Sequence, residues 1–451
     1  MPENILKIRK IDDTEESPDY VGIKVVNGEV EITIPKFLDL SEKEEHKKED
    51  RELLLAFLRS INIAKTLNRD YFKKQKADGN TWPIESYLWL INDYIENGIY
   101  FNRDKKYFFD NKGRIEWKKT IKNMPIISNG NVIYDKLVTS RTSALNSEIT
   151  EIYKICLKYS IEKMSWYRDL NINIEVKQTK SPSEMLYIIR KELTNTFDDI
   201  KRLRFNHMIN ILSLADEQDM SSNNFTYWIN NYHYVYERMV NYLFKGISEK
   251  EKTLFNPKGS WTILGQQEDV PASSLRPDTI FINTSTNPKE VFIIDAKMYK
   301  FGYTTNLADL PETTSIQKQI TYGDHVLTNK EIKDKYGKVT VRNAFIIPYN
   351  KTIFSNTQLD YSLEKINDNL YYVGEAHAEW RNTREKPHER IFTFLIDFNY
   401  LLQNYLKADS SDIDILCKKI DEYLENANNQ GGQNNEWRCS YKNWITKVVK
   451  R

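Results

Sequence analysis

The residues best suited to chemistry lie between positions 276 and 300, in the stretch RPDTIFINTSTNPKEVFIIDAKMYK. Asp278 precedes a short apolar run, and Asp295 and Lys297 follow the next one. Segment 283–289 between the runs contains turn-forming residues and an Asn-Pro pair, which predicts an antiparallel hairpin. A hairpin places the start of its first strand beside the end of its second, so we expect the two carboxylates to converge. Lys297, two residues after Asp295, is expected on the same face.

Converging carboxylates with a nearby lysine suit the metal-dependent hydrolysis of phosphodiester bonds. Mg²⁺ prefers hard oxygen ligands and takes few carboxylates from a protein. We therefore predict that Asp278 and Asp295 are catalytic residues that bind Mg²⁺, with the backbone carbonyl of Ala296 as a further ligand. Lys297 is predicted to orient or deprotonate the attacking water, or to stabilise charge on the phosphorane. The pattern matches the PD-(D/E)xK motif of metal-dependent nucleases.

A simpler interpretation makes Asp278 a turn residue and joins Asp295 and Lys297 in a surface ion pair. The unbroken apolar run 291–294 argues against it, because such a run is typical of a strand buried on both faces. Charged side chains at the end of a buried strand are costly unless they are paired or bind a metal. We therefore favour the metal site.

Predicted helices before and after the motif carry further candidates. Residues 225–244 are predicted to form one amphipathic helix, with Glu237 at the rim of its apolar face. Glu237 is a candidate third carboxylate, both catalytic and metal-binding, although a solvent-facing glutamate is the alternative. The helix predicted at 315–325 carries candidates for substrate contact, and which of its two glutamines faces the site stays open. These candidates are Gln317, Lys318, Gln319 and Tyr322.

The hydrophobic pattern predicts further elements along the whole chain. An Asn-Gly pair between two β-branched runs predicts a hairpin at 21–34. Helices are predicted after Ser41 and at 82–98, 146–164, 183–195, 200–214, 399–407 and 412–426. Strands are predicted at 100–109, 114–117, 134–139, 338–348, 370–373 and 390–397.

These elements predict an α+β or α/β protein with three regions. Residues 1–220 are expected to form a mixed-helical N-terminal α/β domain. Residues 221–427 are expected to form a PD-(D/E)xK restriction-endonuclease-like domain, with a central mixed β-sheet flanked by helices. Residues 428–451 are expected to be a flexible linker, rich in Asn, Gln and Gly, and a basic tail.

Composition narrows the functional class. The 65 basic and 64 acidic residues leave a formal charge of +1, so charge alone does not indicate a nucleic-acid partner. The three cysteines have no metal-binding spacing, and we find no signal peptide or membrane-spanning run, so a cytoplasmic protein without membrane contact is expected. No phosphate-binding loop motif is present, so this chain is not expected to bind a nucleotide itself.

The chain resembles the LlaJI family of restriction endonucleases and, more broadly, the nuclease domain of McrC-type restriction subunits. The glutamate-bearing aromatic helix, RPD, IIDAK and the helix with Gln and Tyr carry the broader resemblance. WPIESYLWLINDYIENG, GRIEWKKTI and YHYVYERMVNYLF carry the closer one. The resemblance implies a nuclease subunit of a multi-component system, with an N-terminal region (strands at 100–117 among its candidates) that docks on an McrB-like AAA+ GTPase.

The favoured function is a Mg²⁺-dependent endonuclease subunit that cleaves unmodified double-stranded DNA together with an McrB-like GTPase and other restriction subunits. One alternative is a self-sufficient type II endonuclease that recognises its own site. An alternative of another class is a non-catalytic adaptor that stimulates a partner GTPase. The intact Asp278, Asp295 and Lys297 argue against the adaptor.

Overall fold

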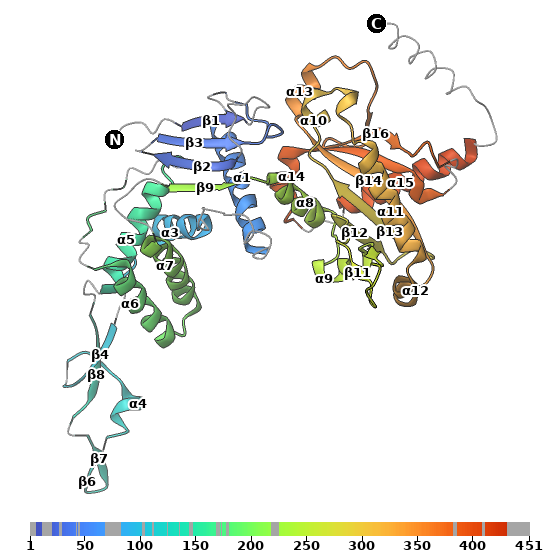
Figure 1. Cartoon of the computed structure of the whole chain (residues 1–451). Coiled ribbons are helices and arrows are strands. Elements are labelled where there is room, and N and C mark those ends of the chain that lie inside the picture. Colours follow the sequence, from blue (N-terminus) through green and yellow to red (C-terminus); the bar gives the residue numbers. More distant parts are fainter. Residues whose placement is uncertain are drawn as a thin grey trace. The chain divides into compact units, whose positions relative to one another are not determined.

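The structure is a computed structural model (Figure 1). It describes residues 6–10, 20–26, 29–41, 43, 46–67, 83–101, 104–110, 112–123, 125–134, 136–143, 148–167, 172, 174–176, 180–217, 225–381, 386–407 and 411–430. The predicted basic tail, and the part of the predicted linker from residue 431 on, lie outside the described residues.

Two compact units divide the chain. Unit 1 comprises Met1–Lys7, Ile23–Ile32 and Asp78–Tyr227, and unit 2 comprises Ile8–Gly22, Thr33–Ala77 and Trp228–Arg451. The last division follows Tyr227, near the predicted boundary at 220. Unit 2 also takes Thr33–Ala77, which the sequence pattern had assigned to the N-terminal domain.

Divisions between the units fall inside every strand of one four-stranded sheet, so each of these strands has residues in both units. Its order is β1-β3-β2-β9, so the two strands of the predicted hairpin at 21–34 are neighbours, while Asn27 and Gly28 of the turn lie outside the described residues. The strands are β1 (Leu6–Lys10), β2 (Val21–Val26), β3 (Glu29–Ile34) and β9 (Phe225–Ile229).

The core of unit 1 is helical. Its helices are α3 (Ile84–Asn97), α5 (Glu148–Lys163), α6 (Pro182–Asn195) and α7 (Asp199–Glu217). Their apolar faces pack together, with α3 against α5 and α7, and α6 against α7. A buried ion pair joins two of them, because Arg204 of α7 donates from Nε and Nη2 to the two carboxylate oxygens of Asp93 on α3, each at 2.8 Å. Such a pair fixes the helices in one register, since either charge alone would be costly to bury.

An arm extends from the helices of unit 1 (Figure 1). It consists of an antiparallel sheet in the order β4-β8-β5, the short helix α4, and a separate β6–β7 hairpin. Asn129 and Gly130 close this hairpin with φ of 50° and 76°, values that a tight type I′ turn requires. The bounds are β4 (Asp104–Phe109), β5 (Arg114–Ile115), α4 (Trp117–Thr120), β6 (Ile126–Ser128), β7 (Asn131–Ile133) and β8 (Val138–Ser143).

Unit 2 is built on a six-stranded mixed sheet in the order β12-β13-β14-β17-β16-β15. The central pairs β13–β14 and β14–β17 are parallel, and the outer pairs are antiparallel. This confirms the predicted mixed α/β architecture with a mixed sheet. The strands are β12 (Thr279–Asn283), β13 (Lys289–Ala296), β14 (Val339–Tyr349), β15 (Glu364–Lys365), β16 (Leu370–Ala376) and β17 (Ile391–Asp397).

Helices cover this sheet. On one face, Tyr322 and Val326 of α11 pack on Ile293 and Val341. On the other, Arg342 pairs with Asp421 of α15. Further helices are α1 (Lys47–Leu67), α8 (Tyr232–Leu243), α9 (Glu249–Lys252), α10 (Phe301–Thr304), α11 (Thr313–Thr328), α12 (Lys330–Tyr336), α13 (Lys351–Asn356), α14 (Phe398–Asn404) and α15 (Ser411–Gln430), with 3₁₀ turns at Thr253–Phe255, Leu307–Asp309 and Pro387–Glu389.

The predicted helix 225–244 was wrong in its first part. Residues 225–229 form β9, and the helix α8 begins only at Tyr232. The run FTYWI is rich in aromatic and β-branched residues, which suit a strand. The polar pair Asn230-Asn231 then separates the strand from the helix, and Glu237 lies on the helix.

Gly302 is required where α10 crosses β14. A Cβ atom there would lie 1.8 Å from the Pro348 carbonyl oxygen. We therefore expect Gly302→Ala to lower the free energy of unfolding by about 2 kcal/mol, measured by urea denaturation. Gly259→Ala is the matched control, because its Cβ would meet only Ala272 at 3.6 Å. Equal unfolding midpoints for the two variants would contradict this packing.

Candidate active site

The β12–β13 hairpin brings the two predicted carboxylates together. The strands pair with Thr279 opposite Ile294 and Ile280 opposite Ile293, a register that continues to Asp278 opposite Asp295. The backbone amide of Ala296 donates a hydrogen bond to Asp278 Oδ2 at 2.9 Å. Strand alternation places Asp278 and Asp295 on the sheet face of Ile280 and Ile293, which α11 covers.

Lys297 lies between the carboxylates. Its Nζ is 3.2 Å from Asp295 Oδ1 and 3.7 Å from Asp278 Oδ2. The Asp295 side chain is buried, whereas about a third of the Lys297 side chain is exposed. The cluster therefore opens to solvent on the lysine side and is closed by the sheet behind the aspartates.

Burial and, after it, charge repulsion raise the pKa values of the acidic groups in the cluster. Burial and the neighbouring Asp278 raise the pKa of Asp295 well above its usual range, against the opposing effect of Lys297. Burial lowers the pKa of Lys297, but Asp278, Asp295 and Glu237 outweigh it and raise that pKa above its ordinary value. With Asp278, Asp295 and Glu237 all ionised, the cluster would hold more negative charge than Lys297 neutralises.

Glu237 of helix α8 interacts electrostatically with the same cluster. Burial, followed by Asp278, raises the pKa of Glu237 to about 8. His233, one turn earlier, was not among the predicted site residues. Loss of surrounding water and the Lys297 ammonium lower its pKa, whereas Asp278 raises it. Spacing of four residues places His233 and Glu237 on one helix face, a signal that was present in the sequence.

The structure separates the four candidates on α11. Gln319 is fully buried, and its Nε2 donates to the Ile293 carbonyl at 2.6 Å. It therefore faces the sheet and holds β13, whereas the sequence left open which of the two glutamines faces the site. Tyr322 is also buried and donates from its hydroxyl to the Arg276 carbonyl at 3.0 Å. Gln317 and Lys318 are exposed.

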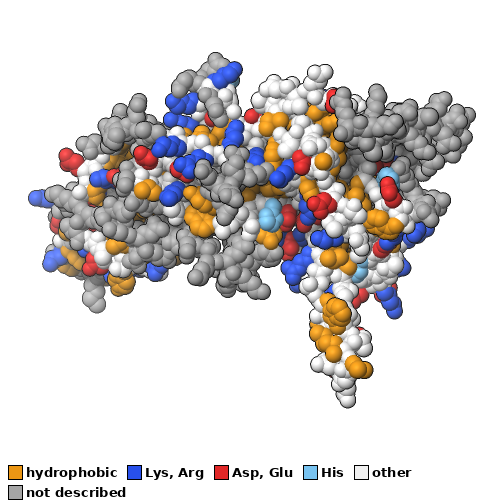
Figure 2. All heavy atoms as spheres, turned by 45° about the horizontal axis from the view of Figure 1, so that its top comes forward, with side chains coloured by type: hydrophobic (Ala, Val, Ile, Leu, Met, Phe, Trp, Pro, Cys, Tyr) orange, Lys and Arg blue, Asp and Glu red, His pale blue; other side chains and the backbone are white. Residues whose placement is uncertain are grey.

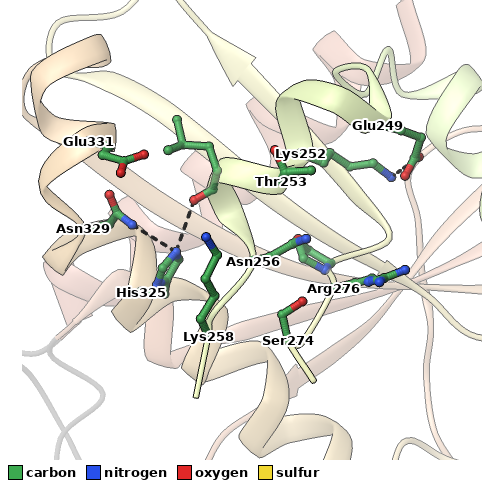
Figure 3. A pocket seen from close by; sticks show the side chains of 12 residues that line it. Glu249, Lys252, Thr253, Asn256, Lys258, Ser274, Arg276, His325, Asn329 and Glu331 are labelled. Atoms are coloured by element: carbon green, nitrogen blue, oxygen red, sulfur yellow. Dashed lines mark hydrogen bonds and ion pairs between the residues drawn. The ribbon is translucent and has the colours of Figure 1, made fainter. Parts of the chain in front are cut away.

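A polar cavity of about 840 Å³, lined in part by the two residues that precede Asp278, lies in unit 2 (Figure 3). Lys252, part of its lining, donates from Nζ to the Asp278 backbone carbonyl at 2.6 Å. Arg276 and Pro277, immediately before Asp278, also line it. Lys252 and Arg276 were not predicted as site residues, because nothing in their spacing links them to the carboxylates. The other lining residues are Glu249, Thr253, Leu254, Asn256, Lys258, Ser274, His325, Asn329 and Glu331.

The donor set suits a hard divalent cation. Within the described residues, no three His, Cys, Asp or Glu side chains are grouped closely enough to hold a metal ion as they stand. Asp278 and Asp295 do converge, and burial together with the repulsion from Asp278 raises the pKa values of Asp295 and Glu237. A cation with a preference for carboxylate and carbonyl oxygens would relieve that repulsion.

Two other expectations concern the rest of the chain. None of the described helices has the length and apolar character needed to cross a membrane. Cys156 and Cys417 are free and buried, and Cys439 lies outside the described residues.

Comparison with known proteins defines the class. The family model described as LlaJI restriction endonuclease matches residues 20–373, more than three quarters of the sequence. The chain therefore belongs to the LlaJI restriction endonuclease family, which confirms the resemblance noted in the sequence.

Individual relatives are more distant. A component of the type II restriction enzyme BsuMI, YdjA of Bacillus subtilis (strain 168), is 24% identical over 414 residues, which cover 84% of each chain. A solved complex of Thermococcus gammatolerans McrB AAA+ hexamers with bound McrC contains a chain with a TM-score of 0.39 and 14% identity, over 87% of this chain and 82% of that one. A second McrBC complex of that organism gives a TM-score of 0.22 at 12% identity, over 49% and 69%.

The raised pKa of Glu237 predicts a pH-dependent stability. A folded pKa of about 8, above the ordinary 4.5, means that folding favours the neutral acid. This stabilisation is complete below the ordinary pKa and is lost as the pH rises through the folded pKa. In metal-free buffer, the free energy of unfolding of the parent should therefore fall relative to that of Glu237→Gln by on the order of 2 kcal/mol as the pH rises from about 5 to about 8.

Urea unfolding at both pH values measures the effect. Exposed Glu268 provides the matched Glu268→Gln control, for which a constant difference from the parent is expected. A constant difference for Glu237→Gln as well would show that Glu237 does not belong to the cluster.

Proposed function

We propose that this chain is the Mg²⁺-dependent nuclease subunit of a restriction system, and that it hydrolyses phosphodiester bonds of unmodified double-stranded DNA. The observation that carries the proposal is the convergence of Asp278 and Asp295 across one hairpin, with Lys297 Nζ within 3.7 Å of both. Membership of a restriction endonuclease family supports the substrate class. The proposal includes the PD-(D/E)xK identity of this domain.

Asp278, Asp295, the Ala296 carbonyl and Glu237 are the proposed ligands. When bound, Mg²⁺ would polarise the phosphate and lower the pKa of its water. The hydrogen bond from the Ala296 amide fixes Asp278 against β13, and Gln319 fixes β13 at Ile293. These contacts hold the ligands in position before substrate arrives, so little rearrangement accompanies the reaction.

Lys297 is assigned to charge stabilisation. The surrounding carboxylates raise its pKa, so the side chain is a cation at neutral pH. A cation cannot accept a proton from the attacking water, but it can stabilise the negative charge that develops on the phosphorane oxygens. Of the roles that the sequence left open, namely orienting the water, deprotonating it and stabilising charge, the proposal therefore takes charge stabilisation.

The proposal also includes partner subunits. The BsuMI relative is named as a component of an enzyme, which supports action within an assembly. The arm of unit 1 exposes apolar side chains that a solitary protein would leave in water: Trp117, Ile121, Ile126, Ile127, Val132 and Ile133. We assign the arm to docking on an McrB-like AAA+ GTPase, which would supply the nucleotide hydrolysis for which this sequence has no motif.

Removal of the catalytic groups tests the nuclease. Asp295→Asn and Lys297→Ala should each reduce cleavage of unmodified DNA by at least roughly 100-fold in the complete restriction system, because each removes charge that acts on the transition state. Cleavage is measured on plasmid DNA with Mg²⁺. Lys418→Ala, at an exposed position on α15, is the matched control and should cut normally.

Retained cleavage by either active-site variant would remove the proposal and favour a non-catalytic adaptor. The purified chain alone, incubated with Mg²⁺ and unmodified DNA, tests the self-sufficient alternative. Site-specific cutting without partners would establish that alternative.

A charge on the arm tests the docking surface. Ile127 is 74% exposed on β6, so Ile127→Asp should leave the fold unchanged but reduce assembly with the partner GTPase by roughly tenfold or more, since a charge would be desolvated at the interface. Co-purification from cells that express the complete system measures assembly. Phe197→Asp, at a 92% exposed position outside the arm, should assemble normally. Equal assembly of both variants would place the partner surface elsewhere.

A further inference from the structure

We propose that the β10–β11 hairpin (Gly259–Ala272) and the cavity at its base form a second DNA-binding element beside the cleavage site. The cavity would take a backbone phosphate, and the apolar hairpin tip would enter a groove of the same duplex. This inference rests on the proposed function, because it takes duplex DNA as the substrate. The two strands are β10 (Ser260–Trp261) and β11 (Val270–Pro271).

The hairpin has a defined shape. Its strands pair with Ser260 opposite Pro271 and Trp261 opposite Val270. The pairing continues toward the base, where the Ala272 amide donates to the Gly259 carbonyl at 2.8 Å. At the tip, the Gln266 amide donates to the Ile263 carbonyl at 3.0 Å, and Gly265 has a φ of 89° that favours glycine. The tip is therefore a closed turn that presents Leu264 at its apex.

The tip is apolar although it is surrounded by solvent. Leu264 is fully exposed, Trp261 is 67% exposed, and Ile263 is exposed as well. Figure 2 shows hydrophobic side chains on the hairpin where it projects from the surface. Glu268 and Asp269 follow the tip, and Asp269 accepts a hydrogen bond from Thr262 at 2.7 Å. An apolar group on a narrow, closed hairpin suits insertion between base pairs or along a groove better than burial in the protein's own core.

The cavity at the hairpin base offers cations to an anion. Lys258 and Arg276 line it with exposed side chains, and neither makes an ion pair within the described residues. The carboxylate of Glu249 is neutralised by Lys252 at 2.6 Å and by Arg238. Glu331 lies beside Asn329, away from Arg276 (Figure 3). The Arg276 side therefore favours a phosphate, for which a guanidinium is well suited.

Continuity with the active site identifies the occupant. Arg276 lies two residues before Asp278, and the Asp278 backbone carbonyl accepts the hydrogen bond from Lys252 of the cavity wall. A strand with its scissile phosphate at the carboxylates would place a neighbouring phosphate near this cavity. An acidic peptide would satisfy the cations but gives no role to the exposed Leu264. Duplex DNA satisfies both, since its phosphates and bases lie side by side.

The test measures duplex binding by the purified full chain in Ca²⁺ buffer, with a fluorescent 30-base-pair DNA and a series of salt concentrations. Leu264→Ser should weaken binding roughly tenfold without changing its salt dependence, because an apolar side chain releases no counterions. Lys258→Gln with Arg276→Gln should weaken binding and reduce the slope of log K against log salt by about 2, because each of the two cations would neutralise one phosphate.

Leu264→Met is the conservative variant and should bind as the parent does. Leu406→Ser is the matched control for an exposed leucine elsewhere in unit 2, and should also be neutral. The proposal is overturned if the parent chain does not bind the duplex, or if both hairpin and cavity variants bind as the parent does. Loss of restriction with unchanged DNA binding also overturns it and assigns the hairpin to a partner protein.

This readout is independent of cleavage. If Asp295→Asn leaves cleavage intact while the hairpin variants lose DNA binding, the proposed function fails and the binding element stands. If Asp295→Asn abolishes cleavage while the hairpin variants bind normally, the proposed function stands and the binding element fails.

Discussion

The site depends on one backbone pairing, the antiparallel register of β12 on β13. It places Asp278 against Asp295, and the Ala296 amide then binds the Asp278 carboxylate at 2.9 Å. The two neighbouring carboxylates repel each other, and burial makes the repulsion stronger. Burial raises the pKa of Asp295, the neighbouring Asp278 raises it further, and Lys297 offsets only part of this shift. A shift of one residue in the pairing would turn one carboxylate to the opposite face and abolish the cluster.

Much of this region could be predicted from the sequence, because the signals are local. Turn residues between two apolar runs indicated the hairpin, and a two-residue spacing put Lys297 beside Asp295. The division between β9 and α8 was missed, because the aromatic run before Asn230 fits a helical stripe as well as a strand. The role of Gln319 could not be inferred, since helical spacing does not say which polar residue a helix turns toward a sheet. The β6–β7 hairpin was missed although Asn129-Gly130 is a strong turn signal.

Each unit exposes apolar side chains on one projecting element, the arm in unit 1 and the β10–β11 hairpin in unit 2. In unit 1, buried groups such as Arg204 and Asp93 tie the helices together, while apolar side chains remain exposed on the arm. In unit 2, apolar residues fill the space between the six-stranded sheet and α11, the tip of the β10–β11 hairpin exposes Leu264, and Lys297 lies beside Asp278 and Asp295. Under the proposed function, the arm of unit 1 would meet the protein partner and the carboxylate cluster of unit 2 would act on the DNA.

Because β12 is an edge strand of the sheet, Asp278 is held by fewer strand pairings than Asp295. Asp295 ends a strand that is hydrogen-bonded on both sides, by β12 and β14. On the other side of β12, two hydrogen bonds are described. The Ile247 amide donates to the Ile280 carbonyl at 2.8 Å, and Lys252 donates to the Asp278 carbonyl at 2.6 Å. The two members of the pair therefore differ in local stability. Loss of the Ile247 and Lys252 contacts would leave Asp278 held by the β12–β13 pairing and the Ala296 amide, whereas Asp295 would stay in a strand that is paired on both sides.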